Sequence, residues 1–540
     1  MPTFSSSVQP SSDAFRANRE DMLALVERLR ELELRAVATS EKRKPRFRQR
    51  NQLTPRERLS HLLDPGMPFL ELMSLANFKV DDPDPEKSIP GASLITGIGY
   101  VSGVRCAVWI DDSGIKAGAF TQTSLPKCLR IMDLALRHKL PLIHCVESAG
   151  ADLMQYKVAG WAKGGGLFYN LAKLSAAGIP TFAVLHGPST AGGAYMPGMS
   201  DTVIGVKNNG LAALGGAALV RAATGEVAND ADLGGAEMHA SVSGLVEYLA
   251  EDDAHALQMC REAVARLGWN ENAASAPERS FDEPLLDTGE LAGTVPVDYR
   301  QAYDVREVLA RIVDGSQFTE VKPRYGAPTV CATASVAGYP CAFLGNNGPI
   351  DPNGAAKVGH FLQTCEKANL PVVFLNNTTG YMVGTEYEQA GMIKHGSKMI
   401  QAVSNLTVPK ITFYLGASFG AGNYGMCGLA FDPDFLFAWP NAQTGVMGGE
   451  QAARTMTQVM TIAAERRGLP VDEERLKTQE DRLIHHFDSQ ADAFTTAGQC
   501  LDDGVIDPRD TRKVLAFALA TCWEARHREL RPTRFGIARY

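Results

Sequence analysis

The chain of 540 residues is too long for a single hydrophobic core, so two or more domains are expected. Its net charge of −8 gives no indication of binding to nucleic acid or to an anionic membrane surface. The ten cysteines occur singly, without a Cys-x-x-Cys pair, which argues against a disulfide framework and against a structural zinc site.

The first 50 residues predict a helical arm that ends in the basic run KRKPRFRQR (Lys42 to Arg50). We expect this run to be a solvated face or a subunit contact, and not a phosphate site, because most charge runs are solvated. The opening residues lack the apolar segment of a secretory signal, and no run approaches the roughly 18 apolar residues of a membrane span. A protein of the cytoplasm, without membrane association, is therefore expected.

After the arm, short apolar runs led by proline alternate with amphipathic stretches. LPLIHCVES (Leu140 to Ser148) and IPTFAVLHG (Ile179 to Gly187) are typical of buried strands. SLPKCLRIMDLALRHK (Ser124 to Lys139) carries apolar residues at intervals of three and four, which indicates a helix. This alternation predicts an α/β fold with a covered, mostly parallel sheet.

The second half of the chain repeats the pattern of the first half, in the same order. The matched stretches are LSHLLDPGMPFLEL with LARIVDGSQFTEV, GYVSGVRCAVWIDD with ASVAGYPCAFLGNN, KLPLIHCVESAG with NLPVVFLNNTTG, IPTFAVLHG with VPKITFYLG, and ALGGAALVRAAT with VMGGEQAARTMT. Their spacing is also kept, because Pro141 precedes Pro180 by 39 residues and Pro371 precedes Pro409 by 38. We infer a duplicated unit.

The segment between the two copies, Asn270 to Asp298, is rich in Ala, Ser, Pro and acidic residues, which is typical of a linker. The sequence therefore predicts an N-terminal domain over residues 1–275, including the helical arm, and a C-terminal domain over residues 290–540.

Each copy also contains a strand, a turn of small residues and a helix start: STAGGAYMPGMSD (Ser189 to Asp201) and SFGAGNYGMCG (Ser418 to Gly428). Small residues let backbone N–H groups approach a ligand closely, and a helix start leaves such groups without intrahelical acceptors. The positive end of the helix dipole adds to the effect. Both turns are therefore candidates for stabilising an oxygen that becomes negative, although a tight turn required by packing is the alternative for either one alone.

Other catalytic motifs are missing from the sequence. His186, His239 and His395 are not spaced as metal ligands, and Ser189 is not in a Gly-x-Ser-x-Gly elbow. We find neither a P-loop nor a dinucleotide-binding fingerprint. Backbone electrostatics without an evident side-chain base suits a reaction whose reagent brings its own base.

Six stretches together identify a family: DPGMPFLEL, STAGGAYMPGMSD, ATGEVANDADLGGAEMH, IKHGSKMIQAVSN, SFGAGNYGMCG and GVMGGEQAA. They resemble the carboxyltransferase (β) subunits of biotin-dependent acyl-CoA carboxylases, and the resemblance covers nearly the whole chain. It implies an α/β fold of two tandem crotonase-like domains. The N-terminal domain would form the acyl-CoA side of the site and the C-terminal domain the biotin side.

In this family, carboxybiotin supplies both the carboxyl group and the base, which explains the missing side-chain base. The resemblance implies that Gly192 and Gly193 hold the thioester oxygen, and that Ala421 and Gly422 hold the biotin oxygen. The implied biotin contacts are Phe419, Gly420, Gly448 and Gly449, and the implied acyl-CoA contacts are Ala191, Ala213, Gly215 and Gly216. No metal is implied.

The sequence carries neither a Met-Lys-Met biotinylation motif nor an ATP-binding domain. Biotin would therefore come on a partner, the biotin carboxylase/biotin carrier (α) subunit. The resemblance further implies a homohexamer of two stacked trimers, with each site between the N-terminal domain of one subunit and the C-terminal domain of another.

Within the family, AGNYGMCG resembles the methylcrotonyl-CoA and geranyl-CoA branch, and IKHGSKMIQAVSNLTVPKIT and SLANFKVDD favour geranyl-CoA. The chain departs from the methylcrotonyl pattern where Ala213 replaces an aromatic residue, Ala217 and Ala218 replace prolines, and Leu429 replaces an arginine. The small Ala213 would leave room for a long acyl tail, unless it lies in a packed turn.

We therefore predict a carboxyltransferase subunit acting on a branched α,β-unsaturated acyl-CoA, with geranyl-CoA as the substrate. Methylcrotonyl-CoA or another acyl-CoA is the alternative. A biotin-dependent decarboxylase subunit and a non-catalytic scaffold are more distant alternatives, and the two intact turns argue against the scaffold.

Overall fold

The computed structural model describes residues 3–152, 157–273, 279–468 and 473–533. The chain divides into two compact units. The N-terminal unit comprises Arg30–Pro277, Gly498–Cys500 and Ala520–Tyr540, and the C-terminal unit comprises Met1–Leu29, Glu278–Ala497 and Leu501–Leu519. Each end of the chain thus contributes to the unit formed by the opposite half of the sequence.

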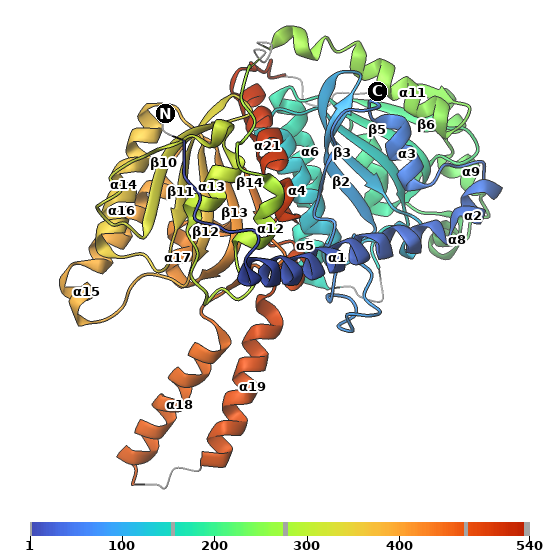
Figure 1. Cartoon of the computed structure of the whole chain (residues 1–540). Helices are drawn as coiled ribbons and strands as arrows, with labels where there is room; N and C mark the ends of the chain where they lie inside the picture. Colours follow the sequence, from blue (N-terminus) through green and yellow to red (C-terminus); the bar gives the residue numbers. More distant parts are fainter. Residues whose placement is uncertain (1–2, 153–156, 274–278, 469–472, 534–540) are drawn as a thin grey trace. The chain divides into compact units, whose positions relative to one another are not determined.

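The N-terminal unit is built on one mixed sheet (Figure 1). Its strand order is β1-β2-β3-β4-β5-β6-β8, and β7 pairs with β5. The strands are β1 (Leu70–Leu72), β2 (Leu94–Val101), β3 (Val104–Asp111), β4 (Leu142–Ser148), β5 (Thr181–Thr190), β6 (Thr202–Val206), β7 (Leu211–Ala213) and β8 (Tyr248–Ala250). The hairpin of β2 and β3 is antiparallel, and the pairs from β3 to β8 are parallel.

The C-terminal unit repeats this arrangement with the order β16-β14-β13-β12-β11-β10-β9, and β15 pairs with β13. The strands are β9 (Thr319–Glu320), β10 (Thr329–Val336), β11 (Tyr339–Asn346), β12 (Val372–Thr378), β13 (Lys410–Phe419), β14 (Phe435–Ala438), β15 (Gln443–Gly445) and β16 (Gly504–Val505). The pairs from β11 onward are again parallel. The predicted α/β class is confirmed in both units.

Helices cover these sheets. In the N-terminal unit they include α2 (Lys44–Gln49), α3 (Pro55–Leu62), α4 (Ser124–Arg137), α5 (Val158–Gly164), α6 (Gly166–Ala177), α7 (Tyr195–Gly198), α8 (Ala217–Thr224), α9 (Asp230–Gly234), α10 (Ala236–Met238) and α11 (Asp253–Ala265). In the C-terminal unit they include α12 (Leu291–Thr294), α13 (Val305–Ile312), α14 (Pro352–Lys367), α15 (Thr385–Gln389), α16 (Met392–Ser404), α17 (Gly420–Gly425), α18 (Gly449–Arg466), α19 (Glu473–Ala491) and α20 (Ala493–Gly498). The long helices α1 (Asp13–Glu41) and α21 (Thr511–Arg526) each contribute residues to both units.

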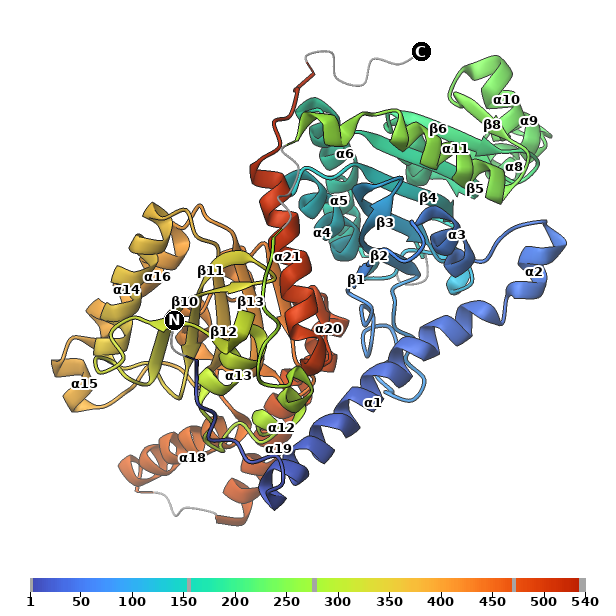
Figure 2. The same cartoon turned by 45° about the horizontal axis from the view of Figure 1, so that its top comes forward.

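Within the C-terminal unit, α14 and α16 lie side by side against the sheet, while α18 and α19 form a hairpin that projects from it (Figures 1 and 2). None of the helices in the described part of the chain has the length and apolar character needed to cross a bilayer.

The duplication inferred from the sequence is visible in the strand pairing. β4 pairs with β5 from Leu142↔Thr181 onward, and β12 pairs with β13 from Val372↔Lys410 onward. Both pairs carry one register shift near their ends, after which Ser148 faces Ser189 and Thr378 faces Ser418. Because the register shift is the same in both strand pairs, the two small-residue turns begin at equivalent positions of the two sheets.

Local sequence explains the helix starts that precede each sheet. Thr54 caps α3 with a capping box completed by Glu57, and the Asp304 side chain caps α13. Behind each sheet a core of apolar side chains is fully buried; it includes Val108, Ile143 and Val184 in the N-terminal unit and Leu344, Val372 and Phe374 in the C-terminal unit. The apolar strand runs thus form the interior that holds the turns.

Candidate functional site

The two predicted turns have the same backbone course. In the N-terminal unit, β5 ends at Thr190 and is followed by the 3-10 turn Ala191–Ala194 and then by α7. In the C-terminal unit, β13 ends at Phe419 and α17 begins at Gly420. The first residue of each turn is left-handed, with φ of +54° at Ala191 and +56° at Gly420. A positive φ is strained for alanine, so the N-terminal turn keeps this course at some expense in stability.

A hydroxyl on the neighbouring strand fixes a second loop beside each turn. Ser148 Oγ donates to the Gly118 carbonyl at 2.8 Å and accepts from the Gly150 N–H at 3.1 Å. Thr378 Oγ1 does the same with Gly348 at 3.1 Å and Gly380 at 3.3 Å. The same hydrogen-bonding pattern thus occurs at two positions 230 residues apart, and it fixes an equivalent loop beside each turn.

The space around the predicted catalytic residues differs from position to position. A Cβ on Gly422 would lie 2.8 Å from the Gly380 Cα, so this position requires glycine, whereas a Cβ on Gly193 would lie 2.8 Å from Ser189 Oγ, a side-chain atom that would have to shift. A Cβ on Gly192 would meet no atom closer than the Phe168 ring at 3.5 Å, which is an ordinary contact. Position 192 and its counterpart Ala421 can therefore be enlarged without disturbing the turn from within.

The chemistry available at each turn is electrostatic. Gly192, Gly193, Ala421 and Gly422 are among the first residues of short helical segments, where N–H groups have no intrahelical acceptor. Such groups favour an oxygen that carries negative charge.

The predicted acyl-CoA contacts lie on and after β7. Ala213 faces Thr190 in the register of β5 and β7, so it is directly beside the N-terminal turn. Its side chain is only 8% exposed, and a Cβ on Gly234 would lie 2.8 Å from the Ala213 Cβ, so this methyl group packs toward α9. Gly215 and Gly216 follow and lead into α8, as predicted for residues near the turn.

The predicted biotin contacts gather around the C-terminal turn. Phe419 faces Gly445 across β13 and β15, and its buried ring makes an edge contact with Tyr299 at 5.3 Å between centroids. A Cβ on Gly448 would lie 2.5 Å from the Tyr299 hydroxyl, while the Gly449 N–H donates to Asp488 Oδ1 at 3.2 Å. Phe419 therefore supports the turn with its side chain and faces Gly448 beneath it.

An amide layer under the C-terminal turn was missed by the sequence interpretation. Ser418 Oγ accepts from Asn376 Nδ2 at 2.8 Å and from Asn423 Nδ2 at 2.7 Å. At the matched places of the N-terminal unit stand Val146 and Ala194, and within the described residues the buried Ser189 Oγ has no hydrogen-bond partner. The asparagines inside the apolar strand run VVFLNNT were the available signal.

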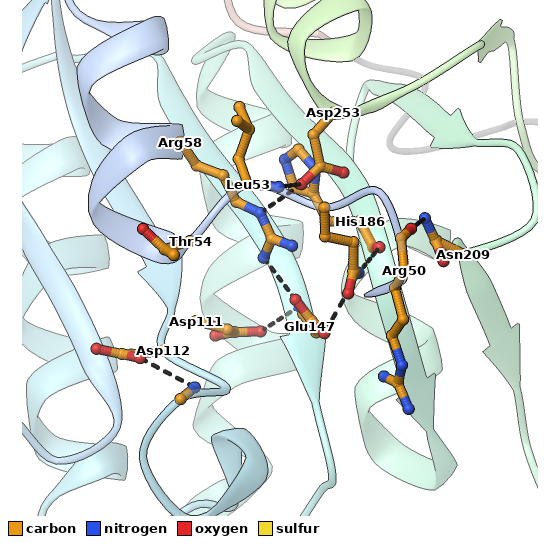
Figure 3. Close-up of polar contacts among 12 residues, drawn as sticks. Arg50, Leu53, Thr54, Arg58, Asp111, Asp112, Glu147, His186, Asn209 and Asp253 are labelled. Carbon is orange, nitrogen blue, oxygen red and sulfur yellow. Dashed lines mark hydrogen bonds and ion pairs between the residues drawn. The ribbon is translucent and has the colours of Figure 1, made fainter. Parts of the chain in front are cut away.

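A buried cluster of charged residues lies behind the N-terminal turn (Figure 3). The fully buried Arg58 of α3 pairs with Glu147 at the end of β4 at 2.6 Å and with Asp253 at the start of α11 at 2.9 Å. Asp253 Oδ1 also lies 2.9 Å from Nδ1 of His186 in β5. The cluster joins two helices to the two strands that carry the turn.

The charges in this cluster stabilise one another. Burial would by itself raise the pKa of Asp253, but His186 and Arg58 outweigh it and hold that pKa below its ordinary value. Burial would lower the pKa of Arg58, but Glu147 and Asp253 raise it. Burial lowers the pKa of His186 and so favours the neutral imidazole, while Asp253 has the opposite, smaller effect. His186, which the sequence did not indicate as a metal ligand, is therefore part of a buried polar network.

The C-terminal unit holds a neutral group at the place matched to Glu147. Asn377 corresponds to Glu147, and its Oδ1 accepts the Ala417 N–H at 2.9 Å. The space above both side chains is reserved by glycine, since a Cβ on Gly187 would lie 2.5 Å from Glu147 Cγ and one on Gly416 would lie 2.8 Å from Asn377 Nδ2. The frame is thus repeated while the charge is not.

Comparison with known proteins identifies the family to which this architecture belongs. The model of the "Carboxyl transferase domain" family matches residues 46–536. The solved β subunit of geranyl-CoA carboxylase from P. aeruginosa is 46% identical, covers 100% of both chains and superposes with a TM-score of 0.93. A probable biotin-dependent acyl-coenzyme A carboxylase β2 subunit of Mycobacterium tuberculosis is 48% identical over 88% of each chain. The mitochondrial methylcrotonoyl-CoA carboxylase β chain of Arabidopsis thaliana is 42% identical over 98% of this chain and 91% of that protein.

Proposed function

This chain belongs to the carboxyl transferase family, and from that premise we propose how its two turns divide the reaction. The chain is the carboxyltransferase (β) subunit of a biotin-dependent acyl-CoA carboxylase of the methylcrotonyl-CoA and geranyl-CoA branch. The predicted family and the predicted pair of tandem crotonase-like domains are both confirmed.

The N-terminal turn binds the acyl-CoA thioester, and the C-terminal turn binds biotin. The N–H groups of Gly192 and Gly193 stabilise the negative charge that develops on the thioester oxygen when the substrate loses its proton. The N–H groups of Ala421 and Gly422 stabilise the biotin ureido oxygen. Donors of this kind contribute roughly 3–4 kcal/mol each to a transition state. The observation that supports both assignments is the matched strand, turn and helix start in the two units.

Biotin arrives on the biotin carboxylase/biotin carrier (α) subunit and supplies the carboxyl group and the base. The residues of this chain fit an uncharged ureido ring, because the C-terminal turn rests on asparagine and serine and not on charged groups. Phe419 and Gly448 lie close together beside that turn. Gly420 is the first residue of α17, and Gly449 is the first residue of α18. This assignment requires no metal ion.

The substrate proposed within the branch is geranyl-CoA, with methylcrotonyl-CoA as the alternative. The full-length likeness to the geranyl-CoA carboxylase β subunit supports this choice, together with small residues at Ala191, Gly215 and Gly216 beside the acyl-CoA turn. Each buried methylene contributes about 0.8 kcal/mol to binding. A site with room for the ten-carbon tail would therefore bind geranyl-CoA much more tightly than methylcrotonyl-CoA.

The substrate is tested by co-purifying the chain with its biotin-bearing partner and measuring ATP- and bicarbonate-dependent carboxylation across acyl-CoAs of increasing length. We expect the highest kcat/KM with geranyl-CoA, and in Ala213→Phe a larger loss with geranyl-CoA than with methylcrotonyl-CoA. Since Ala213 packs toward Gly234, thermal stability is measured alongside. An equal loss with both substrates, or a wild-type enzyme limited to short acyl-CoAs, would contradict the long-tail proposal.

The assembly proposed is a homohexamer, in which the acyl-CoA turn of one subunit faces the biotin turn of another. Large apolar side chains stand exposed beside each turn, including Tyr195 and Leu214 in one unit and the matched Tyr424 and Val446 in the other. Exposed apolar side chains at the same place in both units are a surface that the proposed subunit contact would cover. None of the ten cysteines, all of them in the described part of the chain, forms a disulfide, which fits a reducing compartment, for which we propose the cytoplasm. An active monomer, detected by light scattering coupled to the carboxylation assay, would contradict the assembly.

A further inference from the structure

The basic run Lys42 to Arg50 contains cations of two kinds. Lys44 and Arg48 form ion pairs with Glu57, and Lys44 also pairs with Glu41. Lys42, Arg43, Arg46 and Arg50 are exposed, and among the described residues no ion pair is found for any of the four. Two of the six cations in the run are therefore neutralised within the fold, and the other four are available to a ligand.

The unpaired arginines lie together. Arg43, Arg46 and Arg50 are separated by three and four residues around α2, so they share one face of the helix. Phe47, between them in the sequence, is buried and anchors the helix. The paired Lys44 and Arg48 fall on the other side, toward Glu57.

The charged cluster of Figure 3 fixes this run against the sheet. The Arg58 guanidinium lies 5.8 Å from the centre of the Phe47 ring, and Gln52 Nε2 donates to the His186 carbonyl at 2.7 Å. Asp253 Oδ2 accepts the Leu53 N–H at 2.9 Å. Figure 3 shows Arg50 held at the end of this chain of contacts, with its guanidinium turned away from the cluster. A solvated charge run needs no such anchor.

The anchor places the run at a defined distance from the acyl-CoA turn. Asn209 Nδ2 donates to the Arg50 carbonyl at 2.9 Å, and Asn209 lies shortly before β7. β7 then leads to Ala213, which faces Thr190 at the turn. Asn209 precedes Ala213 by four residues, so it lies no more than about 14 Å from that register position. A ligand with its reacting carbonyl at the turn and its charged end a pantetheine arm away would reach the run.

We propose that Arg43, Arg46 and Arg50 bind the phosphates of the coenzyme A moiety. Planar guanidinium groups bind phosphate oxygens in pairs of hydrogen bonds, and CoA is the phosphate-bearing reactant of the reaction proposed above, on which this inference rests. The equivalent stretch of the other copy, residues 292–300, contains one arginine, Arg300, which pairs with Asp298 and Glu450. The copy assigned to the uncharged biotin ring thus lacks the unpaired cations, which agrees with the division of substrates.

The test uses the whole enzyme with two substrates that differ only in the nucleotide. Arg43→Gln, Arg46→Gln and Arg50→Gln are combined, and KM and kcat are measured with the acyl-CoA and with the corresponding acyl-pantetheine, which has no phosphates. We expect KM for the acyl-CoA to rise by about tenfold, with kcat nearly unchanged, because exposed charge pairs contribute modestly each and add together. KM for the acyl-pantetheine should not change. The control is Arg266→Gln, an exposed arginine at the far end of α11, which should change neither value.

Two results would overturn the proposal. A KM that rises equally for both substrates would show a structural role for the run, and a KM that rises only for the biotin carrier would show that the run binds the partner subunit. Binding of free CoA by calorimetry distinguishes this inference from the proposed function. If the wild-type enzyme carboxylates acyl-CoAs but binds CoA as tightly as the triple variant, only the phosphate assignment fails; if it carboxylates none, the function fails as well.

Discussion

The two units share a backbone design and differ in the charge built around it. Both present a left-handed first turn residue, a hydroxyl that fixes the neighbouring loop, and a glycine above the side chain at position 147 or 377. The N-terminal unit surrounds this frame with Arg58, Glu147 and Asp253, whereas the C-terminal unit uses asparagine and serine.

This difference indicates what each copy had to keep and what it could change after duplication. Under the proposed function, the turn geometry stabilises an oxygen in both units, so it is retained. Under the same proposal, the charged cluster is needed only in the N-terminal unit, where it anchors the basic run proposed to bind the phosphates. Four predictions test the comparison, from the largest expected effect to the smallest.

The strongest test enlarges the same position in each turn. Gly192→Val and Ala421→Val place branched side chains over the donor N–H groups, and we expect each to reduce turnover by about 100-fold or more. Gly193→Val and Gly422→Val should be at least as harmful, but their added Cβ atoms would contact Ser189 or Gly380 at 2.8 Å and strain the turn itself. Turnover is measured on variants whose thermal unfolding matches the wild type. Near-normal turnover in a folded Gly192→Val variant would refute the assignment.

The second test removes the charge difference behind the turns. Glu147→Gln leaves the fully buried Arg58 with Asp253 alone, and we expect a loss of about 3 kcal/mol in the free energy of unfolding. Asn377→Asp should also destabilise, because the new buried carboxylate would have no arginine like Arg58. Urea unfolding measures both.

As a matched control, Glu251→Gln removes an exposed carboxylate that pairs with Lys207 and should change stability by no more than about 0.5 kcal/mol. A Glu147→Gln variant as stable as this control would show that the charged cluster is dispensable.

A third test concerns a feature that both copies retain, a buried lysine on the helix after the second long strand. Lys127 Nζ donates to the Gly91 and Leu94 carbonyls, and burial lowers its pKa to about 8 from 10.5. The unfolded chain therefore binds more protons between these values, so the free energy of unfolding should rise with pH from about 8 to about 10.5, by up to roughly 3 kcal/mol.

In Lys127→Met this rise should disappear from the pH profile of urea unfolding, and in Lys357→Met, at the matched place, a smaller part should disappear. Burial also lowers the pKa of Lys357. A profile of Lys127→Met that is parallel to the wild type would contradict the prediction.

The smallest effect distinguishes the two matched serines. Ser189 Oγ is buried without a hydrogen-bond partner among the described residues, so Ser189→Ala should leave stability unchanged or slightly improved. Ser418→Ala removes the acceptor of Asn376 and Asn423 and should destabilise by about 1 kcal/mol or more. Calorimetric unfolding of both variants checks the contrast, which would be lost if the two substitutions had equal effects.

Much of the fold and both turns could be predicted from the sequence. Proline-led apolar runs, repeated at nearly equal spacing, are local signals, and they located β4, β5, β12 and β13 together with the turns that follow β5 and β13. The resemblance of six sequence motifs to the family then supplied the predicted roles of the turn residues.

What could not be predicted depends on contacts far apart in the chain. Arg58 meets Glu147 and Asp253, which lie 89 and 195 residues away, and only the folded sheet brings them together. The sequence left open whether Ala213 faces an open space or lies in a packed turn, and only the fold shows its methyl group packed toward Gly234. Nothing local shows that Gln52, Leu53 and Arg58 hold the end of the basic run, so the sequence alone could not distinguish a solvated face or a subunit contact from a phosphate site.

The most direct test of the divided site is a crystal structure of the assembled enzyme with an acyl-CoA bound. We expect the thioester oxygen at hydrogen-bonding distance, about 3 Å, from the N–H groups of Gly192 and Gly193. The phosphates should lie against Arg43, Arg46 and Arg50. A thioester oxygen bound at Ala421 and Gly422 instead would contradict the assignment of the two copies.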